Sequence, residues 1–320
     1  MTAVGTTVVT PPEIAAEGTS RLAGRLRGIL RSHRLLAGLC IVGFFVLVGV
    51  IGPFFAGNPN AFSRAEWKPP SGSHLLGTTQ LGQDVLAQLV ASTRATLEIG
   101  FGAGLLATVV SIVIGIGGGY VGGIVDEALS LLSNVVLVIP ALPLVIIIAA
   151  FVKATGVWPV ILVIAVTSWA ASARVLRAQT LSVRNREYVL AARASGERGW
   201  RIVLVEILPN ELPIIVSQFL FAMIFAVLTQ AGLAFLGLAN IDQLTWGNML
   251  FFAQNDQAIS SGAWWWFVPP GLCIALLGMG LALINFALDE LLNPRLRVYR
   301  PAKSGQARAI GQARAIGGGR

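Results

Sequence analysis

The chain has 320 residues, of which 55% are hydrophobic and only 12% are charged, and its mean hydropathy is +0.75. About a quarter of the residues in soluble domains are charged, so this composition excludes an ordinary soluble domain and predicts an integral membrane protein. The net charge of +8 is explained by basic loops kept on one membrane face and attracted to anionic membrane lipids. It needs no nucleic-acid partner. Two cysteines are too few for a disulfide framework or a cysteine metal cluster.

Six apolar runs are each long enough to cross about 30 Å of hydrocarbon as a helix. They cover residues 36–56, 96–119, 128–150, 156–173, 213–237 and 266–288. None alternates every second residue as a barrel strand would. The predicted fold is therefore an all-α membrane protein with six transmembrane helices.

The positions of the basic residues orient these helices, because lysine and arginine are retained on the cytoplasmic side. Of the 23 basic residues, only Arg64, Lys68, Arg94 and Lys153 lie outside three segments, namely the two tails and the loop from residue 174. Both termini are thus predicted to be cytoplasmic. The predicted organisation is a basic tail (1–34), a first transmembrane helix (35–56), an external loop with an interfacial helix (57–95), a five-helix core (96–290) containing a cytoplasmic loop (174–212), and a second tail (291–320).

Before the second run, residues 84–97 are predicted to form an interfacial helix that leads into it. The run itself is rich in glycine, which allows helix backbones to approach closely in lipid. These glycines are Gly100, Gly102, Gly104, Gly115, Gly117, Gly118 and Gly119. A tightly packed helix bundle is the expectation.

The cytoplasmic stretch 187–209 reads EYVLAARASGERGWRIVLVEILP. Its small residues offer a low surface over which the groove of another protein could close. Charged neighbours would fix the register of such a contact, and Pro209 is expected to end the segment before the fifth run. The residues assigned to this docking surface are Glu187, Tyr188, Ala191, Ala192, Arg193, Ala194, Ser195, Gly196, Arg198, Leu208 and Pro209.

This stretch resembles the loop by which permease subunits of bacterial ATP-binding-cassette importers dock onto their ATPase. The family pattern is Glu-Ala-Ala, three residues, Gly, nine residues, Ile, one residue, Leu-Pro. Here Leu190 replaces the acid and Glu206 replaces the isoleucine, and Glu187 lies one turn earlier as a partial substitute for the acid. Over residues 74–297, the motifs HLLGTTQLGQD, GYVGGIVDE, ILPNELP, LAFLGLA and NPRLR resemble the second permease of dipeptide and oligopeptide importers. That family usually has arginine where this chain has Gln83.

The resemblance implies the type I importer permease fold, with a cytoplasmic coupling helix, in the bacterial inner membrane. It also implies four kinds of partner: a second homologous permease, two ATPase subunits, an external solute-binding protein and the surrounding lipid. ATP would draw the coupling helices together and drive alternating access.

The chain itself is predicted to be non-catalytic. It contains no GxxxxGK[ST] motif, and its only lysines are Lys68, Lys153 and Lys303, so it cannot cradle a nucleotide phosphate by P-loop chemistry. It is expected to bind no cofactor, with ATP and magnesium held in the partner subunits, and no metal site is predicted.

The solute is left open, with di- and oligopeptides favoured over oligosaccharides or metal chelates. Trp264, Trp265 and Trp266 are expected to form an interfacial aromatic belt, although stacked indoles could instead guide a sugar. Gln218, Gln230 and Asn285 are candidates for the solute path or for helix-to-helix hydrogen bonds. The competing class is a stand-alone channel or secondary carrier, which the scarcity of mid-span charges disfavours.

Overall fold

A computed structural model describes residues 33–151, 156–240 and 242–292. These residues are helical apart from loops and one isolated bridge between Thr78 and Asp84. Five helices are long and apolar enough to cross a membrane, and a sixth span is counted if one bent helix pair is taken together. The all-helical membrane fold predicted from the sequence is confirmed.

The first half of the chain contains α2 (His33–Phe55), α3 (Val85–Ser111), a π-helical stretch η1 (Ile112–Gly117) and α4 (Gly118–Val121). Residues 85–121 make one long helix, so the expected interfacial helix at 84–97 is the first part of the second span. Asp84 starts it, because its side chain accepts a hydrogen bond from the Ala87 amide at 3.0 Å and thereby caps an amide of the first turn.

The third predicted span, 128–150, is broken. It consists of α5 (Gly123–Val138) and α6 (Ala141–Phe151), which are bent by 90° relative to each other. Pro140 lies between them and cannot donate the amide hydrogen bond that a continuous helix would need at that position.

The second half contains α7 (Val157–Val183), α8 (Glu187–Ala194), α9 (Gly199–Ile202), the π-helical stretch η2 (Val203–Ile207) and α10 (Leu208–Phe235). It ends with α11 (Trp246–Asn255) and α12 (Trp264–Leu292). The loop expected at 174–212 is shorter than predicted, because α7 continues to Val183 and one helix runs from Gly199 to Phe235. Pro209 therefore lies within a helix rather than ending a segment.

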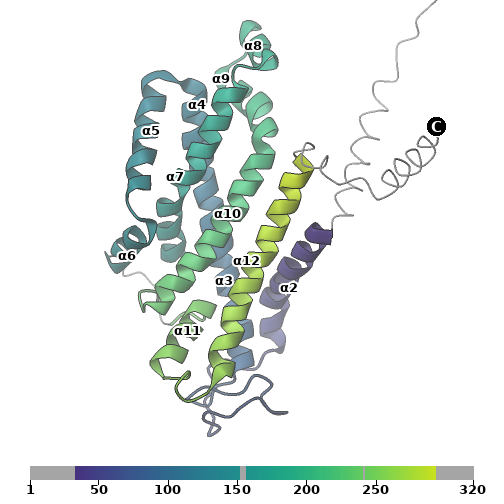
Figure 1. Cartoon of the computed structure of the whole chain (residues 1–320), viewed down its shortest axis with the longest axis vertical. Coiled ribbons are helices and arrows are strands. Elements are labelled where there is room, and N and C mark those ends of the chain that lie inside the picture. Colours follow the sequence, from purple (N-terminus) through teal and green to yellow (C-terminus); the bar gives the residue numbers. More distant parts are fainter. Residues whose placement is uncertain (1–32, 152–155, 241, 293–320) are drawn as a thin grey trace, which may run out of the picture.

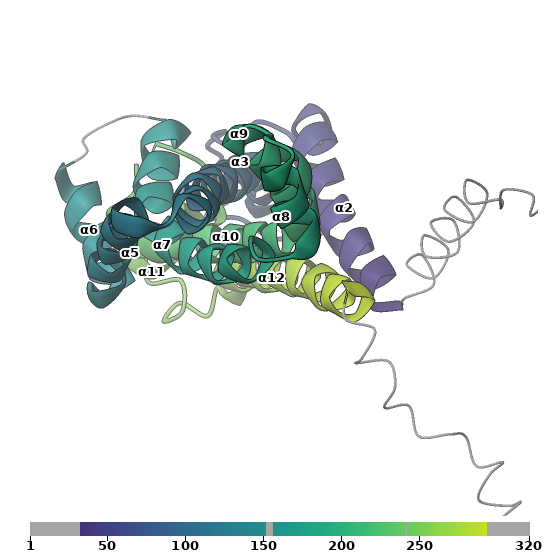
Figure 2. The same cartoon turned by 90° about the horizontal axis from the view of Figure 1, so that it is seen from above.

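The long helices lie side by side, with α8 and α9 at one end of the bundle and α11 at the other (Figure 1). Seen from above, α2 lies near one edge and α5 and α6 lie at the opposite edge (Figure 2). The most extensive packing joins α3 to α10, α3 to α7 and α2 to α12.

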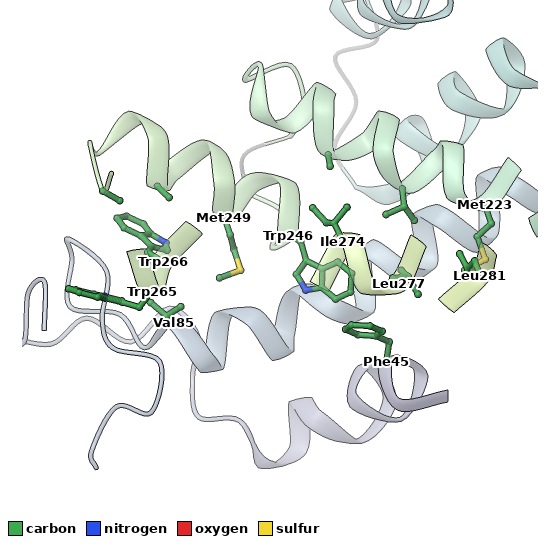
Figure 3. Packing of buried hydrophobic residues seen from close by; sticks show 14 of the residues in the cluster. Phe45, Val85, Met223, Trp246, Met249, Trp265, Trp266, Ile274, Leu277 and Leu281 are labelled. Atoms are coloured by element: carbon green, nitrogen blue, oxygen red, sulfur yellow. The ribbon is translucent and has the colours of Figure 1, made fainter. Parts of the chain in front are cut away.

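The largest buried apolar cluster fills the α11 end of the bundle (Figure 3). Trp246 of α11 is fully buried, and its ring packs edge-on against Phe45 of α2 at 5.2 Å between centroids. Trp265 and Trp266 are also buried here, whereas Trp264 is 54% exposed. Two of the three tryptophans expected in an interfacial belt are thus core residues.

Glycines let the helices of the bundle approach closely, as the sequence predicted. A Cβ atom added at Gly115 would lie 2.5 Å from the Ala173 carbonyl oxygen of α7, and one added at Gly104 would lie 3.0 Å from the Met223 amide of α10. Gly117 is different, because an added Cβ would meet no atom within 4 Å.

Gly115 and Gly117 form a matched pair for testing this packing. We expect Gly115→Ala to destabilise the protein by about 1–3 kcal/mol, because the methyl group would push apart two helix backbones. Gly117→Ala should be neutral or stabilising by up to about 1 kcal/mol, since alanine favours a helix more than glycine does. Thermal unfolding of both variants in detergent checks this, and equal midpoints would contradict the role of Gly115.

Candidate functional site

The candidate site is the turn between α7 and α10, in which α8 is the central element. Arg186 has extended backbone angles and precedes the first residue of α8. The negative charge of Glu187, in the first turn, is stabilised by the positive end of the helix dipole. The helix ends at Ala194, and Gly196, two residues later, has a φ of +77°, which lies in the left-handed region. Its amide donates to the Arg193 carbonyl at 3.0 Å, and the Glu197 amide donates to that of Ala192 at 3.1 Å. This pair of bonds is a Schellman motif, so glycine is required here by the backbone.

One face of α8 is anchored to the bundle. Val189 is fully buried in an apolar cluster with Ile116, Val183 and Ile207, and Ala192, one turn later, packs against the same cluster. Ala192 shares the helix face of Val189 and is only partly exposed, and its assignment to the docking surface stays a prediction.

The other face of α8 is free in the chain as described. Its exposed residues are Glu187, Tyr188, Leu190, Ala191, Arg193, Ala194, Ser195 and Gly196. Two of these are large and apolar: Tyr188 is 40% exposed and Leu190 is 49% exposed. Trp200 on α9 adds a third, at 62%. Large apolar side chains on a polar turn indicate a contact surface for another protein.

Next to this face, an open hollow is lined by Ser195, Gly196, Glu197, Arg198, Trp200 and Arg201. Arg201 lies 3.8 Å from the Glu197 carboxylate, one turn away, whereas Arg198 is exposed and starts α9. A Cβ atom added at Gly196 would meet nothing within 4 Å, so this position is open to a partner. The hollow combines an indole with two arginines, which suits a partner with an acidic and apolar surface.

Tyr120 of α4 holds this turn against the bundle. The Arg193 guanidinium lies 4.8 Å from the centre of the Tyr120 ring, a cation–π contact. Arg184, at the end of α7, donates to the Gly119 carbonyl at 2.8 Å. These two contacts fix the α8 turn to the end of the long second helix.

Leu208 and Pro209 lie where η2 passes into α10. Leu208 packs against the cluster around Val189, and Pro209 is exposed. Proline has no amide hydrogen, and in an α-helix its ring collides with the carbonyl four residues earlier. The wider π-helical turn of η2 directly precedes the turn that contains Pro209. Leu208 thus joins α8 to a transmembrane helix through one apolar cluster.

A buried carboxyl group lies just beyond Pro209. Glu211 is fully buried, and its two carboxyl oxygens lie 2.9 and 3.1 Å from the Thr180 hydroxyl of α7. The same hydroxyl also lies 2.9 Å from the Leu176 carbonyl of its own helix. The sequence analysis missed this contact, because the apolar run that it recognised began only at residue 213. The acid in ILPNELP was the available signal.

The three residues assigned to the solute path are not gathered in one place. Gln230 is buried and donates to the Thr245 hydroxyl at 2.9 Å, and Thr245 caps α11. Gln218 is half-buried on α10, twelve residues or about 18 Å of helix away. Asn285 on α12 is buried, and its side-chain oxygen has no hydrogen-bond partner among the described residues. The hydrogen-bonding role is observed for Gln230, and a role in the solute path stays a prediction for all three.

Comparison with known proteins places this architecture in a family. Residues 111–298 match the family described as the binding-protein-dependent transport system inner membrane component. The chain is 32% identical to the dipeptide transport system permease protein DppC of Bacillus subtilis, over 85% of each chain. It is 30% identical to the oligopeptide transport system permease protein OppC of the same organism, over 83% of this chain and 88% of the relative. A putative peptide transport system permease protein of Brucella suis is 31% identical, over 88% of this chain and 94% of the relative. With its bundle of apolar helices and its anchored, outward-facing α8, the chain belongs to the family of binding-protein-dependent transport system inner membrane components.

Proposed function

We propose that this chain is the permease subunit of an ATP-driven importer of dipeptides or oligopeptides. With a second, homologous permease it would form the translocation path for solute delivered by an external solute-binding protein. The observation that carries the proposal is α8, a helix anchored on one face and open on the other. The names of relatives that match over most of their length, all peptide transport permeases, support a peptide as the solute.

The α8 turn would dock onto an ATPase subunit and transmit its motion. Val189 fixes α8 to Ile207 and to the end of α7, so a displacement of α8 would move α7 and α10 with it. Closure of two ATPases around ATP would draw two such turns together and switch the access of the path from one side to the other. Hydrolysis would reset it.

ATP and magnesium would be held by the ATPase subunits, and the permease would supply no catalytic group. The exposed Trp200 and Arg198 beside Gly196 are the groups offered to the ATPase surface. The α8 end of the bundle would face the cytoplasm together with both termini, and α11 would face outward. The tails themselves, including most of 1–34 and of 291–320, lie outside the described residues.

Affinity purification tests the proposal directly. The tagged chain, extracted from its native membrane in mild detergent, should bring down a second permease and an ATPase in stoichiometric amounts. Proteoliposomes with the complex should take up peptide only with ATP and the solute-binding protein, and proteoliposomes with this chain alone should take up none. A chain that purifies alone and still transports would identify a stand-alone carrier and contradict the importer.

A further inference from the structure

A small hollow with two arginines at its edge lies between α5 and α7, away from the α8 turn. It is lined by Ile114, Gly115, Leu129, Ser130, Ser133, Asn134, Ala173, Arg174 and Arg177. The sequence analysis placed the two arginines in a cytoplasmic loop, but both lie on α7 and well before its end at Val183. The hollow therefore belongs to the bundle.

The two arginines have different partners. Arg177 forms a two-point ion pair with Asp126 of α5, with nitrogen–oxygen distances of 2.5 and 2.8 Å. Arg174 donates to the amide oxygen of Asn134 at 2.6 Å, and among the described residues no carboxylate lies within ion-pair distance of it. The charge of Arg177 is thus neutralised inside the chain, whereas that of Arg174 is not.

The Arg174 side chain points along α7, away from the α8 end of the bundle. On α5, Asn134 lies eight residues after Asp126, which places it about 12 Å further from the α8 end. On α7, Arg174 lies three residues before Arg177, which places it only about 4.5 Å further from that end. The guanidinium must reach away from the α8 end to meet Asn134. The direction agrees with the tilt of helical side chains toward the helix N-terminus.

This direction is the opposite of what lipid would impose. An arginine near the end of a lipid-facing helix extends its side chain toward the nearer membrane surface. Arg174 and Asn134 are nevertheless both exposed on this face of the chain. Two exposed polar side chains, one of them charged, thus lie on helices that are candidate membrane spans, and this favours water or protein opposite them.

We propose that this hollow lines the solute path and that Arg174, oriented by Asn134, binds the terminal carboxylate of the transported peptide. An arginine fork held by an amide matches a carboxylate in two-point geometry. Neutral oligosaccharides have no group for this charge. The inference rests on the importer function and specifies the chemistry of its solute.

Charged thiol reagents on a single cysteine test this site. Cys40 and Cys273 are replaced by alanine, and Val138→Cys is introduced on α5, one turn beyond Asn134, where the side chain is 82% exposed. The purified complex is placed in nanodiscs. The probes are the anionic 2-sulfonatoethyl and the cationic 2-(trimethylammonio)ethyl methanethiosulfonates, with modification of this chain followed by mass spectrometry. The reaction rate of each probe with the introduced cysteine is divided by its rate with a small free thiol. We expect this normalised rate to be about tenfold higher for the anionic probe than for the cationic one.

Matched variants separate the charge of Arg174 from general effects. Arg174→Gln should bring the ratio of the two rates close to one, whereas Arg94→Gln, which removes an exposed arginine of α3, should leave it unchanged. Leu47→Cys, on the exposed apolar face of α2, should react with neither reagent. Millimolar Ala-Ala should protect Val138→Cys from modification, and the C-terminal amide of Ala-Ala should not.

Several results would overturn the inference. Reaction of Val138→Cys as slow as that of Leu47→Cys would place this face of α5 and α7 against lipid. Equal protection by the dipeptide and its amide would exclude carboxylate binding. Loss of the second permease from the Arg174→Gln complex would assign Arg174 to the contact between permeases. These results bear on the solute site when the complex contains its ATPase and hydrolyses ATP. A chain that purifies without an ATPase would instead contradict the proposed importer function, and the proposed solute site with it.

Discussion

Replacing Gly196 with valine is expected to abolish peptide uptake and to leave the ATPase bound weakly or not at all. Two effects act together. A β-branched residue at a φ of +77° is strained by about 1–2 kcal/mol, which would distort the end of α8. In addition, the new side chain would project into the open space where the proposed partner has to approach. Uptake by the reconstituted complex and the amount of copurified ATPase are the measurements.

Gly262 provides a control for the backbone strain. Its φ is +73°, an added Cβ would also meet nothing within 4 Å, and the same pair of hydrogen bonds closes its turn. Because Gly262 lies at the α11 end, Gly262→Val should cost similar stability but retain the ATPase. Equal loss of ATPase in both variants would show that strain alone, and not docking at Gly196, explains the effect.

Thr180→Val is expected to destabilise the protein by about 1–3 kcal/mol. The substitution removes the hydroxyl that donates to Glu211 and leaves a fully buried carboxyl group without its donor. The melting temperature of the detergent-solubilised protein reports the loss. The contact joins α7 to α10 close to the α8 anchor, so uptake should fall as well.

A second substitution should relieve this loss. In Thr180→Val/Glu211→Met both partners are apolar and of similar shape, so the free energy of unfolding should return close to that of the unmodified protein. Thr108→Val is the control, since the Thr108 hydroxyl bonds the Gly104 carbonyl of its own helix and no other group among the described residues. A double variant as unstable as Thr180→Val would show that Glu211 is not the group that needs Thr180.

Hydropathy predicted the spans well because lipid requires every long apolar run to satisfy its own backbone as a helix. It failed where proline or charge interrupted the run. The 90° bend between α5 and α6 depends on Pro140, and a hydropathy average does not register one residue. The C-terminal end of α7 and the start of α10 were misplaced because Arg174, Arg177 and Glu211 lowered the average within continuous helices.

For the α8 turn, the family resemblance implied a short coupling helix within the stretch 187–209, and α8 (Glu187–Ala194) is a short helix in that stretch. It could not separate the two faces of that helix, because alanine is equally common on a buried and on an exposed face. In the structure, the burial of Val189 identifies the face of α8 that packs against the bundle. That burial depends on Ile116, Val183 and Ile207, which come from three other elements. Such long-range contacts are not visible in local spacing. The individual roles of Arg193 and Arg198 toward a partner stay predictions.

The π-helical stretch η2 sets the direction in which the α8 turn faces. A π-helical turn holds more residues than an α-helical turn, so η2 shifts the angular phase between α9 and the transmembrane part of α10. Deleting one residue from η2 would rotate everything before it by about 100° around the helix axis. Trp200 and the turn would then face a different side of the bundle. The number of residues between Gly199 and Pro209 therefore sets the angular position of the α8 turn, and the surface of the proposed ATPase would have to match that angle.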